Sequence, residues 1–197
     1  MPLVLALGKD GKAYLLSAQD LGGIGGNLAV ASISDRPIRT APVAYPTSDG
    51  VFVALQAIGN NCPNVTWPMR ALQGSLNDRT MRIFQRLTGA PSPALVVLKI
   101  RAGPPPTLTT AWCGLIRGGG SPIVTTIDGH SDPIVWIVGA EGDNQLHGFR
   151  GDTGEPIFSG GGDADAVPGV THLQTLIVAD GRLYVPAEGR IYAFTWQ

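Results

Sequence analysis

The sequence predicts an all-β protein whose short antiparallel strands form a unit that repeats along the chain. The 197 residues include 27 glycines and 16 prolines, and both residue types interrupt helices and favour turns. Hydrophobic residues make up 44% of the chain and charged residues 15%, which is typical of a folded domain with a substantial core. The third observation is a set of acidic-Gly turns, each followed by an apolar segment with an aromatic residue. These turns are Asp10-Gly11, Asp49-Gly50, Asp180-Gly181 and Glu188-Gly189.

Two kinds of hairpin are distinguished along the chain. The first kind covers residues 43–55, 124–138 and 176–186, and the second covers residues 5–16, 137–149 and 184–194. Asp128 lies 52 residues before Asp180 and 79 residues after Asp49. The longer spacing predicts an insertion over residues 60–93, with a short helix near residues 75–87. The glycine-rich runs at 22–26 and 118–120 are predicted to connect repeat units.

Four-stranded antiparallel units of about 40 to 50 residues are typical of β-propeller blades. The strand count predicts an incomplete first blade, two complete blades and a last blade that ends after its third strand. We therefore expect residues 1–197 to form one partial β-propeller of about three to four blades. Its terminal sheets would expose apolar faces and unpaired edges, which a monomer seldom tolerates. The remaining blades are expected from a longer protein or from a second copy of the chain.

Gly148 to Glu155, with the sequence Gly-Phe-Arg-Gly-Asp-Thr-Gly-Glu, resembles the repeat of the quinoprotein β-propeller family. In that family an inner hairpin strand ends in an Asp-x-Thr-Gly-like turn and leads into an outer strand with a tryptophan. Phe158 stands where the tryptophan would be, and residues 178–194 resemble the first three strands of the same repeat. A weaker resemblance covers residues 9–23.

The resemblance implies the propeller fold and two kinds of function. The family includes alcohol and sugar dehydrogenases that bind pyrroloquinoline quinone (PQQ) and calcium on the propeller axis, and scaffold proteins that bind no cofactor. The dehydrogenases use two adjacent cysteines, which this chain lacks, and no position here matches their acidic base or calcium ligands. The sequence therefore predicts no catalytic, cofactor-binding or metal-binding residues.

The two cysteines, Cys62 and Cys113, are 51 positions apart and belong to no Cys-x-x-Cys motif. They are interpreted either as two buried thiols or as a disulfide. A disulfide would place the protein in an oxidising compartment, the periplasm or the extracellular space. The neighbouring Asn64-Val65-Thr66 triplet, which also matches a glycosylation acceptor, predicts that Cys62 lies in an exposed loop.

Charge and hydropathy exclude two classes of partner. The formal net charge is −1, with 14 basic and 15 acidic residues spread along the chain, so no basic patch predicts nucleic-acid binding. No apolar run approaches the roughly 20 residues of a transmembrane helix. The N-terminal apolar run has no preceding basic region, and we expect it to be a strand rather than a signal peptide.

Several polar residues are candidates for functional sites. Asp128, His130 and Asp132 could hold a metal ion at a loop tip, but a hairpin turn with polar residues is the favoured interpretation. Asp163 and Asp165 have calcium-like spacing but lack the remaining ligands of a calcium loop, so they are interpreted as a linker. His147 and His172 are expected to be packing or surface residues. Ser17, Ser121 and Ser159 lack the context of a hydrolase nucleophile.

The favoured hypothesis is a non-catalytic β-propeller module that serves as a binding or scaffold surface for a protein partner in a larger exported assembly. One alternative is the C-terminal portion of a PQQ-dependent dehydrogenase whose active site needs further blades. The other is a half propeller that closes as a homodimer.

Overall fold

The computed structural model describes residues 1–59, 61–64 and 91–195. They form four small antiparallel sheets, named sheet 1 to sheet 4 in chain order, and contain one short 3-10 turn and no α-helix. Sheets 1 and 2 contain β1 (Leu3–Leu7), β2 (Lys12–Ser17) and β3 (Ala29–Ser32), then β4 (Val43–Thr47), β5 (Gly50–Gln56), β6 (Ser92–Arg101) and β7 (Thr107–Ile116). Sheets 3 and 4 contain β8 (Ile123–Thr125), β9 (Ile134–Val138), β10 (Leu146–Arg150) and β11 (Pro156–Ser159), then β12 (Ile177–Ala179), β13 (Arg182–Ala187) and β14 (Arg190–Thr195).

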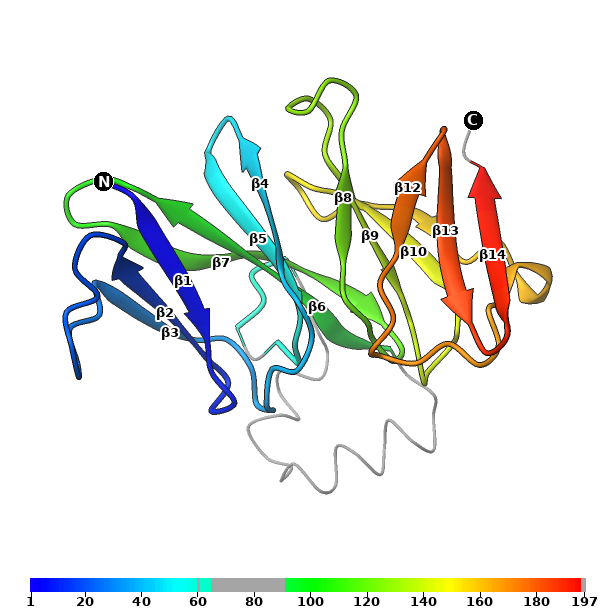
Figure 1. Cartoon of the computed structure of the whole chain (residues 1–197), viewed down its shortest axis with the longest axis horizontal. Coiled ribbons are helices and arrows are strands. Elements are labelled where there is room, and N and C mark those ends of the chain that lie inside the picture. The colour runs from blue at the N-terminus through cyan, green and yellow to red at the C-terminus, as the bar shows by residue number, and fades with distance from the viewer. Residues whose placement is uncertain (60, 65–90, 196–197) are drawn as a thin grey trace.

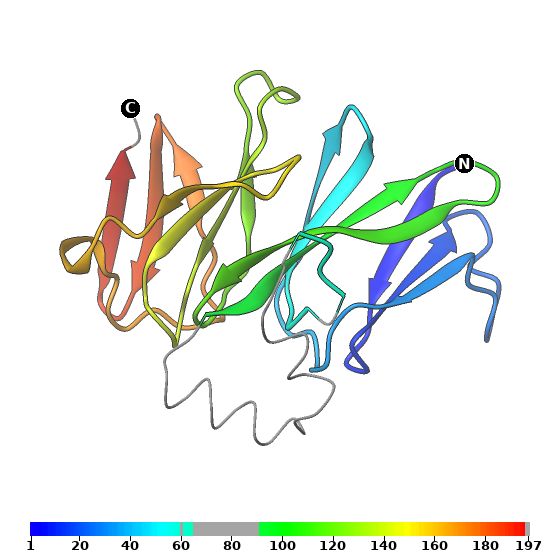
Figure 2. The same cartoon turned by 180° about the vertical axis from the view of Figure 1, so that it is seen from behind.

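Within each sheet, every strand pairs with its neighbours in the sequence, so each sheet is a simple meander. The sheets have three, four, four and three strands, which are the counts predicted for the successive repeat units. The predicted helix at residues 75–87 and most of the 60–93 insertion lie outside the described residues. Figure 1 shows the four sheets side by side in chain order, with sheet 1 on the left and sheet 4 on the right. In the reverse view of Figure 2, the last strands β7 and β11 lie nearest the viewer.

Three apolar layers hold the stack together, one between each pair of successive sheets. We call the face of a sheet that is turned toward the preceding sheet its N-side face, and the opposite one its C-side face. Sheet 1 has no preceding sheet, so its N-side face is the one turned away from sheet 2. Alternation along each strand sends successive side chains to opposite faces. In β9, for example, Val135 and Ile137 pack toward sheet 2, whereas Trp136 and Val138 pack toward sheet 4. Sheets 2 and 3 therefore contribute side chains to two layers each, and sheets 1 and 4 to only one.

The turns β1–β2 and β9–β10 differ in length by two residues but are closed by equivalent backbone hydrogen bonds. In the first, the Gly8 amide donates to the Lys12 carbonyl and the Gly11 amide donates to the Gly8 carbonyl. In the second, the Gly139 amide donates to the Gln145 carbonyl, and the Gly142 amide likewise donates to the Gly139 carbonyl. The β1–β2 hairpin of sheet 1 therefore corresponds to the β9–β10 hairpin of sheet 3.

A carboxylate organises each of these two turns in the same way. Asp10 accepts the backbone amide two residues later and the hydroxyl of Tyr14, four residues later. Asp143 accepts the amide two residues later and contacts the His147 Nε2 at 3.1 Å, again four residues later. The hydrogen bond from Tyr14 lowers the pKa of Asp10 and raises the pKa of Tyr14. His147 is thus buried as part of the repeat's turn rather than placed in a site.

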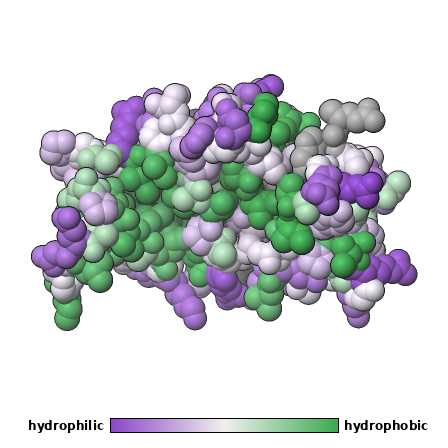
Figure 3. All heavy atoms as spheres, turned by 45° about the horizontal axis from the view of Figure 1, so that its top comes forward, coloured by the Kyte–Doolittle hydropathy of each residue, from purple (hydrophilic) through white to green (hydrophobic). Residues whose placement is uncertain are grey.

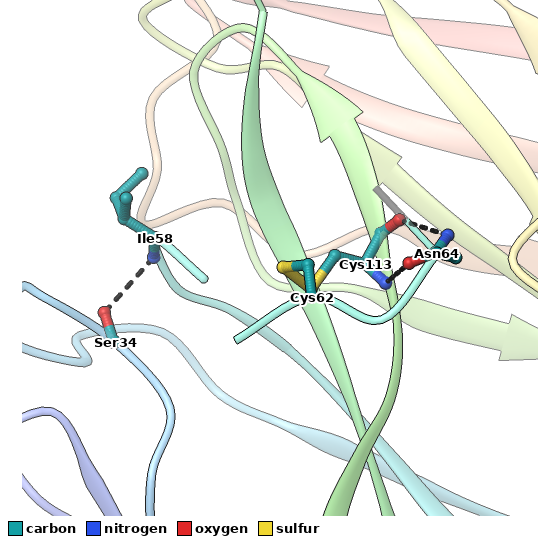
Figure 4. The surroundings of a disulfide bond; sticks show 5 residues. All are labelled: Ser34, Ile58, Cys62, Asn64 and Cys113. Carbon is teal, nitrogen blue, oxygen red and sulfur yellow. Dashed lines mark hydrogen bonds between the residues drawn. A yellow bond between two sulfur atoms is a disulfide. The ribbon is translucent and has the colours of Figure 1, made fainter. Parts of the chain in front are cut away.

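Cys62 and Cys113 form a disulfide that ties the segment after β5 to β7 (Figure 4). The expected exposed position of Cys62 is wrong, because its side chain is buried in the layer between sheets 1 and 2. The side chain of Asn64 holds the segment down: its Nδ2 donates to the Cys113 carbonyl at 3.0 Å and its Oδ1 accepts the Cys113 amide at 2.8 Å. Asn64, which is itself exposed, therefore holds the Cys62 segment against β7 and keeps Cys62 buried.

The two glycine-rich runs differ from their prediction in one case. Residues 118–120 lie between β7 and β8 and do connect sheets 2 and 3. Residues 22–26 lie between β2 and β3, so they form a loop within sheet 1 rather than a connection between sheets. A glycine run permits a turn but does not determine which strands the turn joins.

Candidate binding cleft

A cleft of about 750 Å³ lies at the end of the stack that is uppermost in Figure 1. It is formed by the β4–β5 turn, the β8–β9 loop, the β10–β11 turn and the end of β14. The residues that line it are Thr47, Ser48, His130, Ser131, Asp132, Pro133, Ile134, Trp136, Arg150, Asp152, Ile157, Phe158 and Thr195. Sheet 3 supplies most of them.

Asp128 organises the β8–β9 loop from within. Its Oδ1 accepts the backbone amides of His130 at 2.8 Å and Ser131 at 2.6 Å, and its Oδ2 accepts the Ser131 hydroxyl at 2.8 Å. These bonds, with that from the Ser131 amide the strongest, lower the pKa of Asp128 to about 2, because hydrogen bonds to a carboxylate favour its charged form. The loop closes further through the Ile127 amide, which donates to the Ser131 carbonyl.

The cluster of Asp128, His130 and Asp132 is therefore divided by the structure. Asp128 uses both oxygens on its own loop, whereas His130 and Asp132 line the cleft. Asp132 adopts a positive φ of 49°, which lets the chain reverse before Pro133. In residues 1–59, 61–64 and 91–195, no three His, Cys, Asp or Glu side chains are grouped as metal ligands would be.

The β10–β11 turn is fixed by two aromatic side chains of sheet 2. The Gly151 carbonyl accepts hydrogen bonds from the Tyr45 hydroxyl at 2.7 Å and from the Trp112 Nε1 at 2.9 Å. Both donors are buried, and burial raises the pKa of Tyr45 well above its usual range. The Trp112 indole also lies against Gly154, where a Cβ would come within 2.6 Å of the ring. Glycine therefore suits position 154 for two reasons: its φ is positive, at 76°, and the Trp112 ring leaves no room for a Cβ.

The cleft combines an apolar floor with a charged rim. Phe158 packs against Trp136 with ring centroids 6.3 Å apart, and the Trp136 Nε1 donates to the Thr125 hydroxyl at 2.9 Å. On the rim, the guanidinium of Arg150 is paired with Glu155 at 3.2 Å. The exposed carboxylates of Asp132 and Asp152 remain as the rim's excess charge. The cleft therefore favours a ligand with a positive charge beside an apolar group.

A second hollow, of about 530 Å³, lies at the opposite end of the stack and includes Glu141 and His172. Their side chains are joined at 2.7 Å, and this hydrogen bond lowers the pKa of Glu141. The two residues link the β9–β10 turn to the connection before β12. His172 therefore contacts the β9–β10 turn, which agrees with the packing or surface role expected for it.

The other predicted polar residues are placed outside both hollows. Asp163 and Asp165 form the 3-10 turn in the β11–β12 connection, which is the linker position expected for them. The Ser17 hydroxyl accepts the Gln19 amide within its own loop, and the Ser121 hydroxyl accepts the Ala41 amide from a different sheet connection. Their hydroxyls hold backbone segments in place.

Sequence reasoning assigned Arg150 and Asp152 only to a structural turn and did not identify Tyr45. That turn is structural, and its outward side chains also form the cleft rim. The resemblance placed its tryptophan in the outer strand after the turn, at the position of Phe158, and gave no sign of a contact with a tryptophan from another sheet. The outer-strand tryptophan that meets the turn is Trp112, from the preceding sheet.

No protein-family model matches this chain, and no curated protein is similar enough to count as a match. The described residues contain no helix of the length and hydrophobicity needed to cross a membrane.

Proposed function

We propose that this chain is a partial β-propeller that acts as a non-catalytic binding module, with an extended basic segment of a partner protein as the ligand of the upper cleft. The observation that carries this proposal is the combination of an apolar floor at Phe158 and Trp136 with the rim carboxylates of Asp132 and Asp152. Binding sites of this kind place a few charged groups around an apolar surface.

The arrangement of the sheets supports the propeller. Successive meanders of up to four strands stack face to face, as blades do. The position of the Asp152-Thr153-Gly154 turn, between the inner strand β10 and the outer strand β11, supports the quinoprotein-type repeat. The Cys62–Cys113 disulfide supports a periplasmic or extracellular location.

The charge of the cleft supports a basic ligand over an acidic one. Arg150 is neutralised by Glu155, whereas Asp132 and Asp152 have no ion-pair partner within the described part of the chain. A lysine or arginine of the ligand would pair with these carboxylates while an aliphatic neighbour covers the floor. Exposed pairs of this type contribute about 0.2–1 kcal/mol each, so the peptide is expected to bind weakly on its own.

The test is an NMR titration of the intact protein with acetyl-Ile-Lys-Ile-amide. We expect the backbone amides of residues 130–134 and 150–158 to shift, and the matched peptide with Glu in place of Lys to bind more weakly. The double variant Asp132→Asn/Asp152→Asn should weaken binding of the Lys peptide by about 3–10-fold. Asp180→Asn, on a turn of sheet 4 outside the cleft, is the control and should leave binding unchanged.

If the Lys and Glu peptides bind equally well, or if neither binds, the proposal of a basic ligand is overturned. A second arm adds PQQ and calcium and follows the quinone absorbance and dye-linked oxidation of ethanol and glucose. If oxidation of ethanol or glucose depends on the added quinone, the dehydrogenase hypothesis replaces that of a non-catalytic binding module. This arm separates the two functions because the peptide titration requires no cofactor.

A further inference from the structure

The C-side face of sheet 4 repeats the C-side face of sheet 3. The corresponding cross-strand pairs are Trp136–Gly148 and Val138–Leu146 in sheet 3, and Tyr184–Ala193 and Pro186–Ile191 in sheet 4. In sheet 3 this face is covered by sheet 4, and Leu146 is only 2% exposed. In sheet 4 it is uncovered, and the equivalent Ile191 is 72% exposed. Sheet 4 thus presents to solvent the same kind of surface that sheet 3 buries.

The N-side face of sheet 1 repeats the N-side face of sheet 3 in the same manner. The corresponding pairs are Val135–Phe149 and Ile137–His147 in sheet 3, and Val4–Leu16 and Ala6–Tyr14 in sheet 1. The equivalent hydrogen bonds that close the two turns, from Gly8 to Lys12 and from Gly139 to Gln145, support this correspondence independently of the side chains. Figure 3 shows hydrophobic residues gathered on the left, where Figure 1 places sheet 1.

We propose that a second copy of this chain covers both faces, with sheet 4 of each copy packed on sheet 1 of the other around a two-fold axis. The chain already makes this contact three times, because each internal layer joins the C-side face of one sheet to the N-side face of the next. The free faces of sheets 4 and 1 are the two halves of a fourth such layer. Two copies bring eight sheets together, which lies within the range of four to eight blades of closed propellers.

The alternative arrangement, in which sheet 4 packs on sheet 4, is disfavoured by the same repeat. It would join two C-side faces, a contact that none of the three layers within the chain uses. A head-to-tail contact generally produces a ring or a filament. Here the ring closes with two copies because each chain provides four sheets of the eight.

The test is sedimentation velocity of the intact protein between 1 and about 100 μM, with mass measured by light scattering. The chain has a mass of 20.6 kDa, so the dimer is expected at twice that value. Leu16→Asp and Ile191→Lys each place an unpaired charge in a covered layer, and each is expected to raise the dimer dissociation constant at least ~100-fold. Ile24→Asp, on the exposed β2–β3 loop, is the control and should leave the dimer intact.

Mixing the two variants distinguishes the arrangements. In a head-to-tail ring, sheet 4 of the Leu16→Asp chain can pack on sheet 1 of the Ile191→Lys chain, so the mixture should form a heterodimer that neither variant forms alone. If sheet 4 packs on itself, Leu16→Asp alone remains dimeric, and that result overturns the proposal. A wild-type protein that stays at 20.6 kDa up to about 100 μM overturns it directly. Both outcomes are independent of the peptide titration, which reports only on the cleft.

Discussion

Sheet 3 and the two end sheets have the same strand pattern and differ in what covers them. Val135 in β9 and Val4 in β1 occupy equivalent positions, yet Val135 is fully buried and Val4 is 39% exposed. The difference does not come from hydropathy, because both positions carry the same residue type. Burial in this stack is set by the presence of a neighbouring sheet. Equivalent substitutions in sheet 3 and in an end sheet therefore measure the contribution of one sheet–sheet layer.

The largest effect is expected from Phe149→Ala compared with Leu16→Ala. Phe149 lies in the layer between sheets 2 and 3 against Trp112, with ring centroids 6.0 Å apart, and it is 3% exposed. Its truncation should lower the free energy of unfolding by about 3–5 kcal/mol. Leu16 is the equivalent residue of β2 and is only half-buried within one chain, so its truncation should cost about 1 kcal/mol. Urea unfolding at low micromolar protein measures both.

Protein concentration then sharpens this comparison. If a second copy covers sheet 1, the effect of Leu16→Ala should grow as the concentration is raised, because association stabilises the folded chain by mass action. The effect of Phe149→Ala should stay nearly constant, since its layer lies within one chain. Equal costs for the two substitutions at low concentration would contradict the assignment of covered and uncovered faces.

Much of the fold could be predicted because turns and alternation are local. The Asp49-Gly50 and Asp180-Gly181 pairs mark the β4–β5 and β12–β13 turns, and period-two patterns mark the strands on either side. The number of strands in each sheet followed from counting these units. Local patterns were misleading where a distant residue decides the outcome, as for Cys62, which is bonded to Cys113 of β7, 51 residues away.

The cleft could be predicted only in part, for the same reason. Asp132 and Asp152 were visible as polar turn residues, but they belong to different turns and come together only through folding. The Gly151 carbonyl is held by Trp112 and Tyr45, which lie 39 and 106 residues away in the sequence. No period or spacing in the sequence records contacts across a layer.

The next comparison concerns what stabilises the layer between sheets 1 and 2 and the layer between sheets 2 and 3. The first contains the Cys62–Cys113 disulfide, whereas the second relies on the hydrogen bonds of Tyr45 and Trp112. Cys62→Ala/Cys113→Ala should lower the free energy of unfolding by about 2–4 kcal/mol, because the bond closes a long loop in the unfolded chain. Urea unfolding of the variant measures this loss.

Wild-type protein unfolded in excess dithiothreitol is the matched control and should approach the double variant in stability. Hydrogen exchange shows which part of the structure loses stability when the disulfide is removed. Amides of β3 and β7, which meet across the first layer, should exchange faster in the variant than those of β13, in sheet 4. A variant as stable as the oxidised wild type, or uniform acceleration across all sheets, would show that the disulfide does not act on this layer.

The smallest effect compares the long upper loop of sheet 3 with the tight turn of sheet 4. Asp128 binds two amides of its loop, and its pKa is lowered to about 2 from a usual value of 3.8. A carboxyl whose pKa is lower in the folded state stabilises the fold above its unfolded pKa. That contribution is lost as the pH falls through about 2. We expect the amide resonances of His130 and Ser131 to shift with this midpoint in an NMR titration.

Two substitutions determine whether the titration belongs to Asp128. Asp128→Asn removes the ionisable group and keeps an oxygen acceptor, so the His130 and Ser131 amides should stop responding between pH 4 and about pH 2. Asp180→Asn changes the corresponding Asp-Gly turn of sheet 4, where Ala179 pairs directly with Arg182 and leaves only two residues in the turn, and it should leave the response intact. If the response survives Asp128→Asn, another carboxylate controls the loop.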